Sequence, residues 1–168
     1  KKSVPLDNNV YNNETLQTEI NVRDSGLEKV INSLELYSNK DEINIEEVST
    51  IYGTLKFTTV ELSRLKKSVD MNMKIADFRV FGIIEPSAEL IIEQESSEVS
   101  LNIINFSHRF DATLEQGLVR LPKSYINIDS KMLDTSKKLR EINASYGKEN
   151  NGKISITGKK GLILLKEL

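Results

Sequence analysis

The single histidine of the chain is the first candidate for chemistry. His108 lies in the segment Ser107–Asp111, so a hydroxyl and a carboxylate are close to it in sequence. A general base, however, needs a nucleophile or a metal within reach and a partner that orients the imidazole ring. The spacing does not indicate such an arrangement, and a lone histidine at the end of a strand is usually a polar residue satisfied by its neighbours. We therefore predict that no chemistry depends on His108.

Carboxylates are the second candidate, because a row of them can bind a hard cation. Glu85, Glu89, Glu93 and Glu95 are spaced by four, four and two residues, so most of them would share one face of a strand. A solvated sheet face, or an edge that charge protects from aggregation, is the simpler interpretation. One histidine and no cysteine argue against a zinc or copper site, and EF-hand, phosphate-loop and nucleophile-elbow motifs are absent. We expect no metal and no other cofactor.

One short segment contains part of a nuclease motif. A metal-dependent nuclease requires an acidic pair followed by a nearby lysine, and Asp129–Lys131 supplies a fragment of this pattern. The cap of a helix that begins at Asp129 or Ser130 explains the same residues better. A metal-dependent hydrolase or nuclease therefore stays an alternative function, behind a non-catalytic one.

Basic residues are concentrated toward the end of the sequence. Residues 119–168 contain eleven Lys and Arg against five Asp and Glu, whereas the remainder contains twelve against twenty. Such a split predicts an acidic partner, or oppositely charged parts that face each other within the fold or between subunits. We take as the candidate interaction surface the basic residues of a predicted helix and of a predicted hairpin tip: Lys131, Lys137, Lys138, Arg140, Lys159 and Lys160.

Nucleic-acid binding is the alternative use of this surface, since clustered lysines can follow a phosphate backbone. The chain as a whole, however, has a net charge of −2 and only 6% aromatic residues. Binding of single strands needs aromatic side chains among the basic ones, and the basic third offers only Tyr125 and Tyr146. A protein partner or self-association is therefore the expectation that we prefer.

Length and composition predict a single folded domain. The chain has 168 residues, of which 38% are hydrophobic, enough for one core. No run approaches the ~18 apolar residues of a transmembrane helix. We predict a flexible tail over residues 1–14 and one domain over residues 15–168; the alternative divides this domain into a mainly helical part, 15–69, and a mainly β part, 70–168.

The most β-like stretch is Met71–Phe106, where apolar and polar residues alternate with a period of two. We predict several strands here, with Leu101 and Ile103 buried in a central one and a hairpin tip at Glu95–Glu98. Such a run is long enough to nucleate an antiparallel sheet. Further strands are expected over residues 15–22, 110–114 and 118–121, and in a C-terminal hairpin over residues 154–165.

Helical spacing is typical of three other segments. Residues 27–34 have apolar side chains at i, i+3, i+4 and i+7, and residues 45–69 continue with a three–four spacing that predicts a helical pair. A disturbance is expected between Gly53 and Thr59, and the alternative makes residues 55–59 a strand. A last helix would run from Asp129 or Ser130 to Tyr146 and stop at Gly147.

Together these patterns predict an α+β domain: an antiparallel sheet with a helical pair and one further helix packed on one face, and a C-terminal β-hairpin. Catalytic signatures are absent, and no motif is specific enough to indicate a family. We therefore predict a non-catalytic binding or assembly module that acts through protein–protein contacts, of the kind found in phage-structural or bacterial envelope proteins. The sequence indicates neither the partner nor the compartment.

Overall fold

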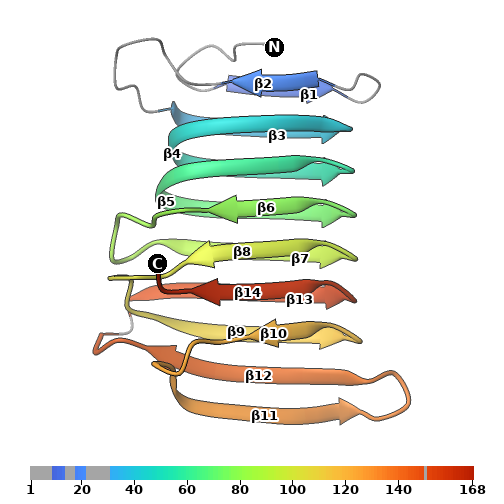
Figure 1. Cartoon of the computed structure of the whole chain (residues 1–168), viewed down its shortest axis with the longest axis vertical. Helices are drawn as coiled ribbons and strands as arrows, with labels where there is room; N and C mark the ends of the chain where they lie inside the picture. The colour runs from blue at the N-terminus through green and yellow to red at the C-terminus, as the bar shows by residue number, and fades with distance from the viewer. Residues whose placement is uncertain (1–8, 14–17, 22–30, 150) are drawn as a thin grey trace.

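The computed structural model describes residues 9–13, 18–21, 31–149 and 151–168, and these residues form strands and no helix (Figure 1). All the described strands belong to one curled sheet. They are β1 Asn9–Asn13, β2 Thr18–Asn21, β3 Ile31–Asn39, β4 Asp41–Lys56, β5 Thr59–Lys74, β6 Asp77–Val80, β7 Glu89–Glu95, β8 Glu98–Asn102, β9 His108–Glu115, β10 Leu118–Arg120, β11 Ile126–Asp134, β12 Leu139–Tyr146, β13 Gly152–Lys159 and β14 Leu162–Lys166.

The chain coils so that neighbouring turns pair in parallel, as in a two-sided β-solenoid. The pairs Glu42–Thr59 and Lys56–Lys74 show that the turn from β4 to β5 takes 17 or 18 residues. Each turn contributes one strand to either face. The first face consists of β3, the second halves of β4 and β5, β7, β13 and β9, and the second face of the first halves of β4 and β5, β6, β8, β14 and β10.

Apolar side chains on the inner sides of the two faces stack in columns. On the second face Val60, Phe78 and Val99 lie in register on successive strands, and all are fully buried. On the first face Val69 and Leu90 do the same. Equivalent residues lie about 4.8 Å apart, the spacing of hydrogen-bonded strands. Each buried aliphatic or aromatic side chain contributes about 1.5–3 kcal/mol, so these columns hold the two faces together.

The last turn in sequence is not the last turn in space. β13 inserts between β7 and β9, and β14 inserts between β8 and β10, with parallel pairing on both sides. Beyond β9 the direction of pairing changes, because β12 is antiparallel to β9 and β11 is antiparallel to β12. The hairpin β11–β12 therefore ends the sheet, as the lower end of Figure 1 shows.

The predicted α+β class with an antiparallel sheet is wrong. The described residues contain no helix, and of their strand pairs only β9–β12 and β11–β12 are antiparallel. The strands predicted within Met71–Phe106 are confirmed. Leu101 is buried in β8 as predicted, whereas Ile103 is buried just after the end of β8 and not within a strand. Three connections are instead corners at which the chain passes from the first face to the second: the predicted hairpin tip at 95–98, the link at 116–117 between two predicted strands, and 158–161 in the predicted C-terminal hairpin.

The three–four spacing of residues 45–69 comes from a phase shift within long strands. β4 and β5 have 16 residues each and run from the second face to the first without a break. Alternate residues point inward on each face, but the phase changes at the bend, where Glu47 and Val48 are both buried. In β5 the buried residues Leu62, Leu65 and Val69 consequently lie three and four apart. A period of two with such a shift imitates a helical period.

The predicted last helix over residues 129–146 is the antiparallel hairpin β11–β12. Its apolar stripe is divided between the two strands, with Met132 on β11 and Ile142 on β12. The helix predicted over residues 27–34 falls partly outside the described residues, and its last residues belong to β3. Of the predicted tail, residues 1–8 and 14 lie outside the described residues, and Asn9–Asn13 form β1.

Two neighbouring isoleucines test this core. Ile103 is fully buried beside β8, whereas Ile104 is 42% exposed. We expect Ile103→Ala to lower the free energy of unfolding by about 2–5 kcal/mol, because it leaves a cavity that the stacked columns cannot close. Ile104→Ala, the matched control, should cost less than about 1 kcal/mol. Equal losses for the two variants in denaturant unfolding would contradict the inward orientation of Ile103.

Candidate interaction surface

One edge of the coil consists of tight corners that follow one another along the stack. At each corner the chain changes face through a residue with positive φ, and the six φ values lie between 47° and 64°. The turn of the β11–β12 hairpin adds a seventh such residue, Lys138. We call this edge the corner ridge. It comprises these seven residues, each with the residue before it: Asn39–Lys40, Lys56–Phe57, Lys74–Ile75, Glu95–Ser96, Lys159–Lys160, Glu115–Gln116 and Lys137–Lys138.

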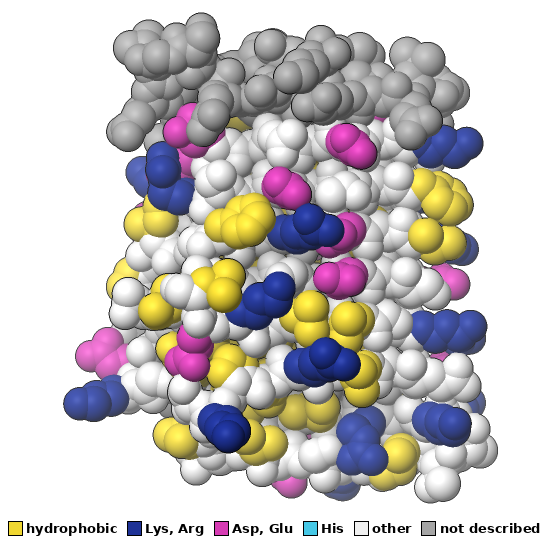
Figure 2. Space-filling view, in the orientation of Figure 1, with side chains coloured by type: hydrophobic (Ala, Val, Ile, Leu, Met, Phe, Trp, Pro, Cys, Tyr) yellow, Lys and Arg dark blue, Asp and Glu magenta, His cyan; other side chains and the backbone are white. Residues whose placement is uncertain are grey.

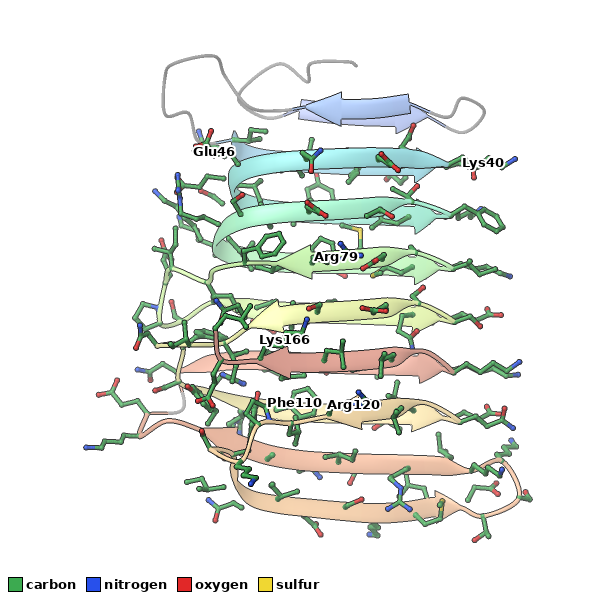
Figure 3. All side chains as sticks on the ribbon, viewed as in Figure 1. Lys40, Glu46, Arg79, Phe110, Arg120 and Lys166 are labelled. Carbon is green, nitrogen blue, oxygen red and sulfur yellow. The ribbon has the colours of Figure 1, made fainter. Side chains whose placement is uncertain are left out.

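Backbone hydrogen bonds continue along the ridge from corner to corner. The amide of Ile75, for example, donates to the carbonyl oxygen of Glu95 on the next turn, with 2.9 Å between N and O. At the strand spacing of the sheet, the seven corners span about 29 Å. Figure 3 shows Lys40 at one end of this edge and Glu46 on the opposite edge of the coil. The spatial order of the corners is Lys40, Phe57, Ile75, Ser96, Lys160, Gln116 and Lys138.

Buried hydroxyl groups fix the corners from inside. At two corners the residue after the corner residue turns its side chain back: Thr58 Oγ1 donates to the carbonyl of Lys56 (2.8 Å) and Ser97 Oγ to that of Glu95 (3.0 Å). Such local bonds add to the backbone ladder, which itself continues through the corners. A further buried network behind the first corner joins Ser38, Asp41 and Thr58.

A buried amide links two turns at the middle of the ridge. Gln94 is 2% exposed; its Oε1 accepts from the backbone amide of Ser97 (3.0 Å), and its Nε2 donates to the carbonyl of Lys160 (2.7 Å). Gly161 leaves the room for this side chain, because a Cβ at that position would lie 2.2 Å from Gln94 Oε1. The backbone of the ridge is therefore held rigidly.

The ridge is strongly basic and has two apolar tips (Figure 2, right-hand edge). It carries seven exposed lysines against the carboxylates of Glu95 and Glu115. Among the described residues, the ion pair found on the ridge is that of Lys74 Nζ with Glu95, at 3.8 Å and largely exposed, so it contributes little. Phe57 and Ile75 lie at successive corners with 51% and 48% of their surfaces exposed.

Ile75 is an unusual residue for its backbone conformation. Its φ is 47°, in the left-handed region where a β-branched side chain is crowded against the backbone. Such a conformation costs about 1–2 kcal/mol relative to glycine. An open groove of about 660 Å³ runs beside Phe57 and Ile75, and Asp77 and Glu98 lie on its other flank. Strained, exposed residues of this kind are typical of functional surfaces.

The structure brings together four of the six basic residues predicted from the sequence. Lys137, Lys138, Lys159 and Lys160 all lie on the ridge, although two come from the hairpin and two from an inserted corner. Lys131 lies within β11 and Arg140 near the start of β12, and neither belongs to the ridge residues. Sequence reasoning missed the ridge lysines of the N-terminal half, whose only signal is a separation of 16 to 18 residues: Lys40, Lys56 and Lys74.

His108 is fully buried in an aromatic cluster at the opposite edge. Its ring stacks on Phe106 at 4.9 Å and on Tyr146 at 5.5 Å between centroids. Nδ1 lies 2.6 Å from the carbonyl oxygen of Phe106 and must therefore donate; Nε2 then accepts from the hydroxyl of Tyr125, also at 2.6 Å. Both ring nitrogens are thus occupied by structural bonds. Asp111, its neighbour in sequence, lies on the outer side of β9.

Burial controls the protonation of this cluster. It lowers the pKa of His108 to about 4, although the bond to Phe106 acts in the other direction. Burial also raises the pKa of Tyr125 above its usual range, and that of Tyr146 to about 12, where the carboxylate of Glu167 accepts the Tyr146 hydroxyl at 2.7 Å. At neutral pH the three side chains are uncharged, which suits a core and gives no group poised to exchange a proton.

The predicted carboxylate row is a solvated strand face. Glu89, Glu93 and Glu95 lie exposed on the outer side of β7, and Glu85 precedes that strand. Within the described part of the chain, no three His, Cys, Asp or Glu side chains are grouped so as to hold a metal ion. In the same part, no helix is long and apolar enough to cross a membrane.

Comparisons with known proteins add no family assignment. No family model, curated protein or solved structure matches the chain. The corner ridge therefore has to be interpreted from its own residues.

The neutral state of His108 predicts a pH dependence of stability. The pKa is about 4 in the folded chain and about 6.5 when unfolded, so the unfolded state takes up a proton first as the pH falls. The free energy of unfolding should fall by up to about 3 kcal/mol between pH 6.5 and pH 4. Urea titrations of the wild type and of His108→Gln isolate this contribution, because carboxylates titrate equally in both. Parallel pH profiles of the two proteins would mean that folding does not lower the pKa of His108.

Proposed function

We propose that the chain is a non-catalytic binding module whose corner ridge binds an extended, acidic segment of a partner protein. The observation that supports this most is the concentration of seven lysines and two exposed apolar side chains on one straight edge. Lysines on neighbouring corners create a positive potential that attracts carboxylates. The apolar tips, Phe57 and Ile75, provide the contacts that charge alone does not.

The rigidity of the ridge favours binding. The backbone of its corners is hydrogen-bonded from turn to turn, and Gln94 and Ser97 hold it from behind. A surface ordered in advance loses little conformational entropy when a partner binds. Lysine side chains on such a backbone can adjust to carboxylates that are not perfectly spaced, because each is a flexible point charge.

The charge pattern fits a protein better than a nucleic acid. Glu95 and Glu115 interrupt the lysines, and Asp77 and Glu98 line the groove beside the apolar tips. A phosphate backbone carries one charge per nucleotide and would meet these carboxylates, whereas a peptide can place polar or apolar residues there. Phe57 is the single aromatic side chain among the ridge residues, so successive bases would find only one stacking platform. Arginine, the residue suited to bidentate phosphate contacts, is absent from the ridge.

Matched peptides test this function. The probes are a fluorescent peptide of alternating Glu and Leu, an all-Glu peptide with the same number of carboxylates, and an oligothymidylate of the same charge. We expect the Glu/Leu peptide to bind most tightly, because it offers both charges and apolar side chains, and its affinity to fall only moderately with salt. Fluorescence anisotropy at several salt concentrations provides the measurement.

Two lysine pairs provide variant and control. Lys159→Glu with Lys160→Glu reverses two of the seven lysine charges of the ridge and should weaken binding of the Glu/Leu peptide about tenfold or more. Lys66→Glu with Lys67→Glu makes the same change of charge on the opposite edge and should leave binding nearly unchanged. Equal effects of the two pairs would refute a localised site. Tightest binding of the oligonucleotide, with a steep salt dependence, would assign the ridge to nucleic acid instead.

A substitution at Ile75 separates the effect of backbone strain on stability from the effect of the side chain on binding. We expect Ile75→Asn to raise the free energy of unfolding by up to about 1 kcal/mol, because asparagine tolerates a positive φ better, and to weaken binding of the Glu/Leu peptide. Ile91→Asn is the control, since Ile91 is 42% exposed but lies within β7 without a positive φ. A loss of stability in Ile75→Asn equal to that in the control would show that this corner is unstrained.

A further inference from the structure

The sheet ends in a strand with a free edge. β11 is the last strand of the sheet order, and among the described strands it pairs with β12 alone. Eight of its nine residues are exposed, as the burial pattern of the strand shows. A free edge presents unpaired amide and carbonyl groups, which can pair with a strand of another chain. Figure 1 shows this strand at the end of the stack, with nothing beyond it in the described part of the chain.

Large apolar side chains gather on this strand. Ile126, Ile128, Met132 and Leu133 are between 41% and 55% exposed. They make up four of the thirteen large hydrophobic side chains found exposed over the described residues, in a strand of nine. An apolar edge strand of this kind is a pairing site for a strand that also matches its three charged residues, Asp129, Lys131 and Asp134.

β11 is complementary to a second copy of itself. If two copies pair antiparallel with Ser130 opposite Ser130, then Asp129 lies opposite Lys131 of the second copy, and Ile128 opposite its Met132. Asp129 and Lys131 share the outer face of the sheet, where β12 presents Asn143 and Glu141 beside them. On the outer face, Asp129 then lies next to Lys131 of the second copy, which in turn lies next to Glu141 of that copy, so charges of opposite sign are neighbours. On the inner face, Ile128 lies opposite Met132. Opposite charges and apolar pairs directly across strands are stabilising.

Neighbouring registers lack this match. A shift that places Asp129 opposite Asp129, or Lys131 opposite Lys131, brings like charges together, and a shift by one residue mixes the two faces. β-bulges flank the regular part of β11, between Ile126 and Asp129 and between Met132 and Asp134. Bulges interrupt pairing, so they limit the regular edge to Asp129–Met132, with Ile128 at its border, and leave few registers to choose from.

We propose that the chain forms a two-fold symmetric dimer through antiparallel pairing of β11 with β11 of a second copy, with Ser130 at the two-fold axis. Such an interface is isologous, so it closes at two copies and does not propagate into a filament. The proposal does not rest on the function of the corner ridge. The dimer would nevertheless affect the ridges, because antiparallel pairing places them on opposite edges. The short interface predicts a dissociation constant of about micromolar order.

Charge exchange across the axis tests the register. Because of the symmetry, Asp129→Lys alone or Lys131→Asp alone creates two like-charge pairs, and each should raise the dimer dissociation constant tenfold or more. The double variant, Asp129→Lys with Lys131→Asp, makes every pair opposite again and should restore dimerisation. Sedimentation equilibrium over a concentration series measures all four proteins, with far-ultraviolet circular dichroism to confirm folding.

Cysteine crosslinking tests the same geometry independently. The chain has no cysteine, so Ser130→Cys introduces one thiol per copy. Residues directly opposite in an antiparallel pair have Cα atoms about 4.5–5.5 Å apart, within the range that a disulfide spans. Mild oxidation should crosslink Ser130→Cys rapidly and Ser136→Cys slowly, since Ser136 lies exposed in the hairpin turn away from the axis.

Each outcome decides the proposal. Failure of the double variant to restore the dimer, or equal crosslinking at positions 130 and 136, would overturn the β11 pairing. A dimer that ignores all these changes would place the interface elsewhere, and assembly beyond two copies would indicate head-to-tail stacking. Lys159→Glu with Lys160→Glu should leave the dimer intact, so the failure of the ridge proposal and of this one can be told apart.

Discussion

The parallel, in-register hydrogen-bond ladder is the interaction on which everything else in this chain depends. It places each residue directly over its equivalent on the next turn, so inner residues form apolar columns and corner residues form a line. A ladder of this type does not end where a strand turns. The bond from Ile75 to Glu95 continues it through the corner. Corner positions therefore recur along one edge at the strand spacing. Seven lysines at or next to these positions form a basic surface, although most of them are far apart in sequence.

The corners require a positive φ, and most of the residues that adopt it are neither glycine nor asparagine. A positive φ is most easily met by glycine or asparagine, yet the corner residues include Lys40, Phe57 and Ile75. Burial cannot explain this choice, because these side chains point outward and their conformational strain gains nothing for the core. When a strained residue stands where glycine or asparagine would be less strained, the strain usually belongs to a functional site. The buried bonds of Thr58, Ser97 and Gln94 keep the corners in place despite the strain.

Sequence reasoning found the strands where a period of two stands alone and failed where two faces are joined. In β7 and β8 the alternation is simple and was recognised; in β4 and β5 the bend shifts its phase and produces a helical spacing. The repeat itself is hidden, because equivalent residues are 18 apart from Thr59 to Asp77, 21 apart from Asp77 to Glu98 and 64 apart from Glu98 to Leu162. Half of the ridge was found through clustered lysines, and the other half requires the register that only the coil supplies.

The inserted last turn connects the two candidate surfaces. β13 and β14 lie between turns that precede them in sequence, so β9 and β10 join the rest of the coil only when the C-terminal segment is in place. That segment also brings Lys159 and Lys160 to the ridge, and it supports β9, on which the β11–β12 hairpin is built. Contacts of such high sequence separation form slowly. Insertion of the last turn therefore joins the C-terminal half of the ridge to its N-terminal half, and joins the β9–β12–β11 sheet to the rest of the coil.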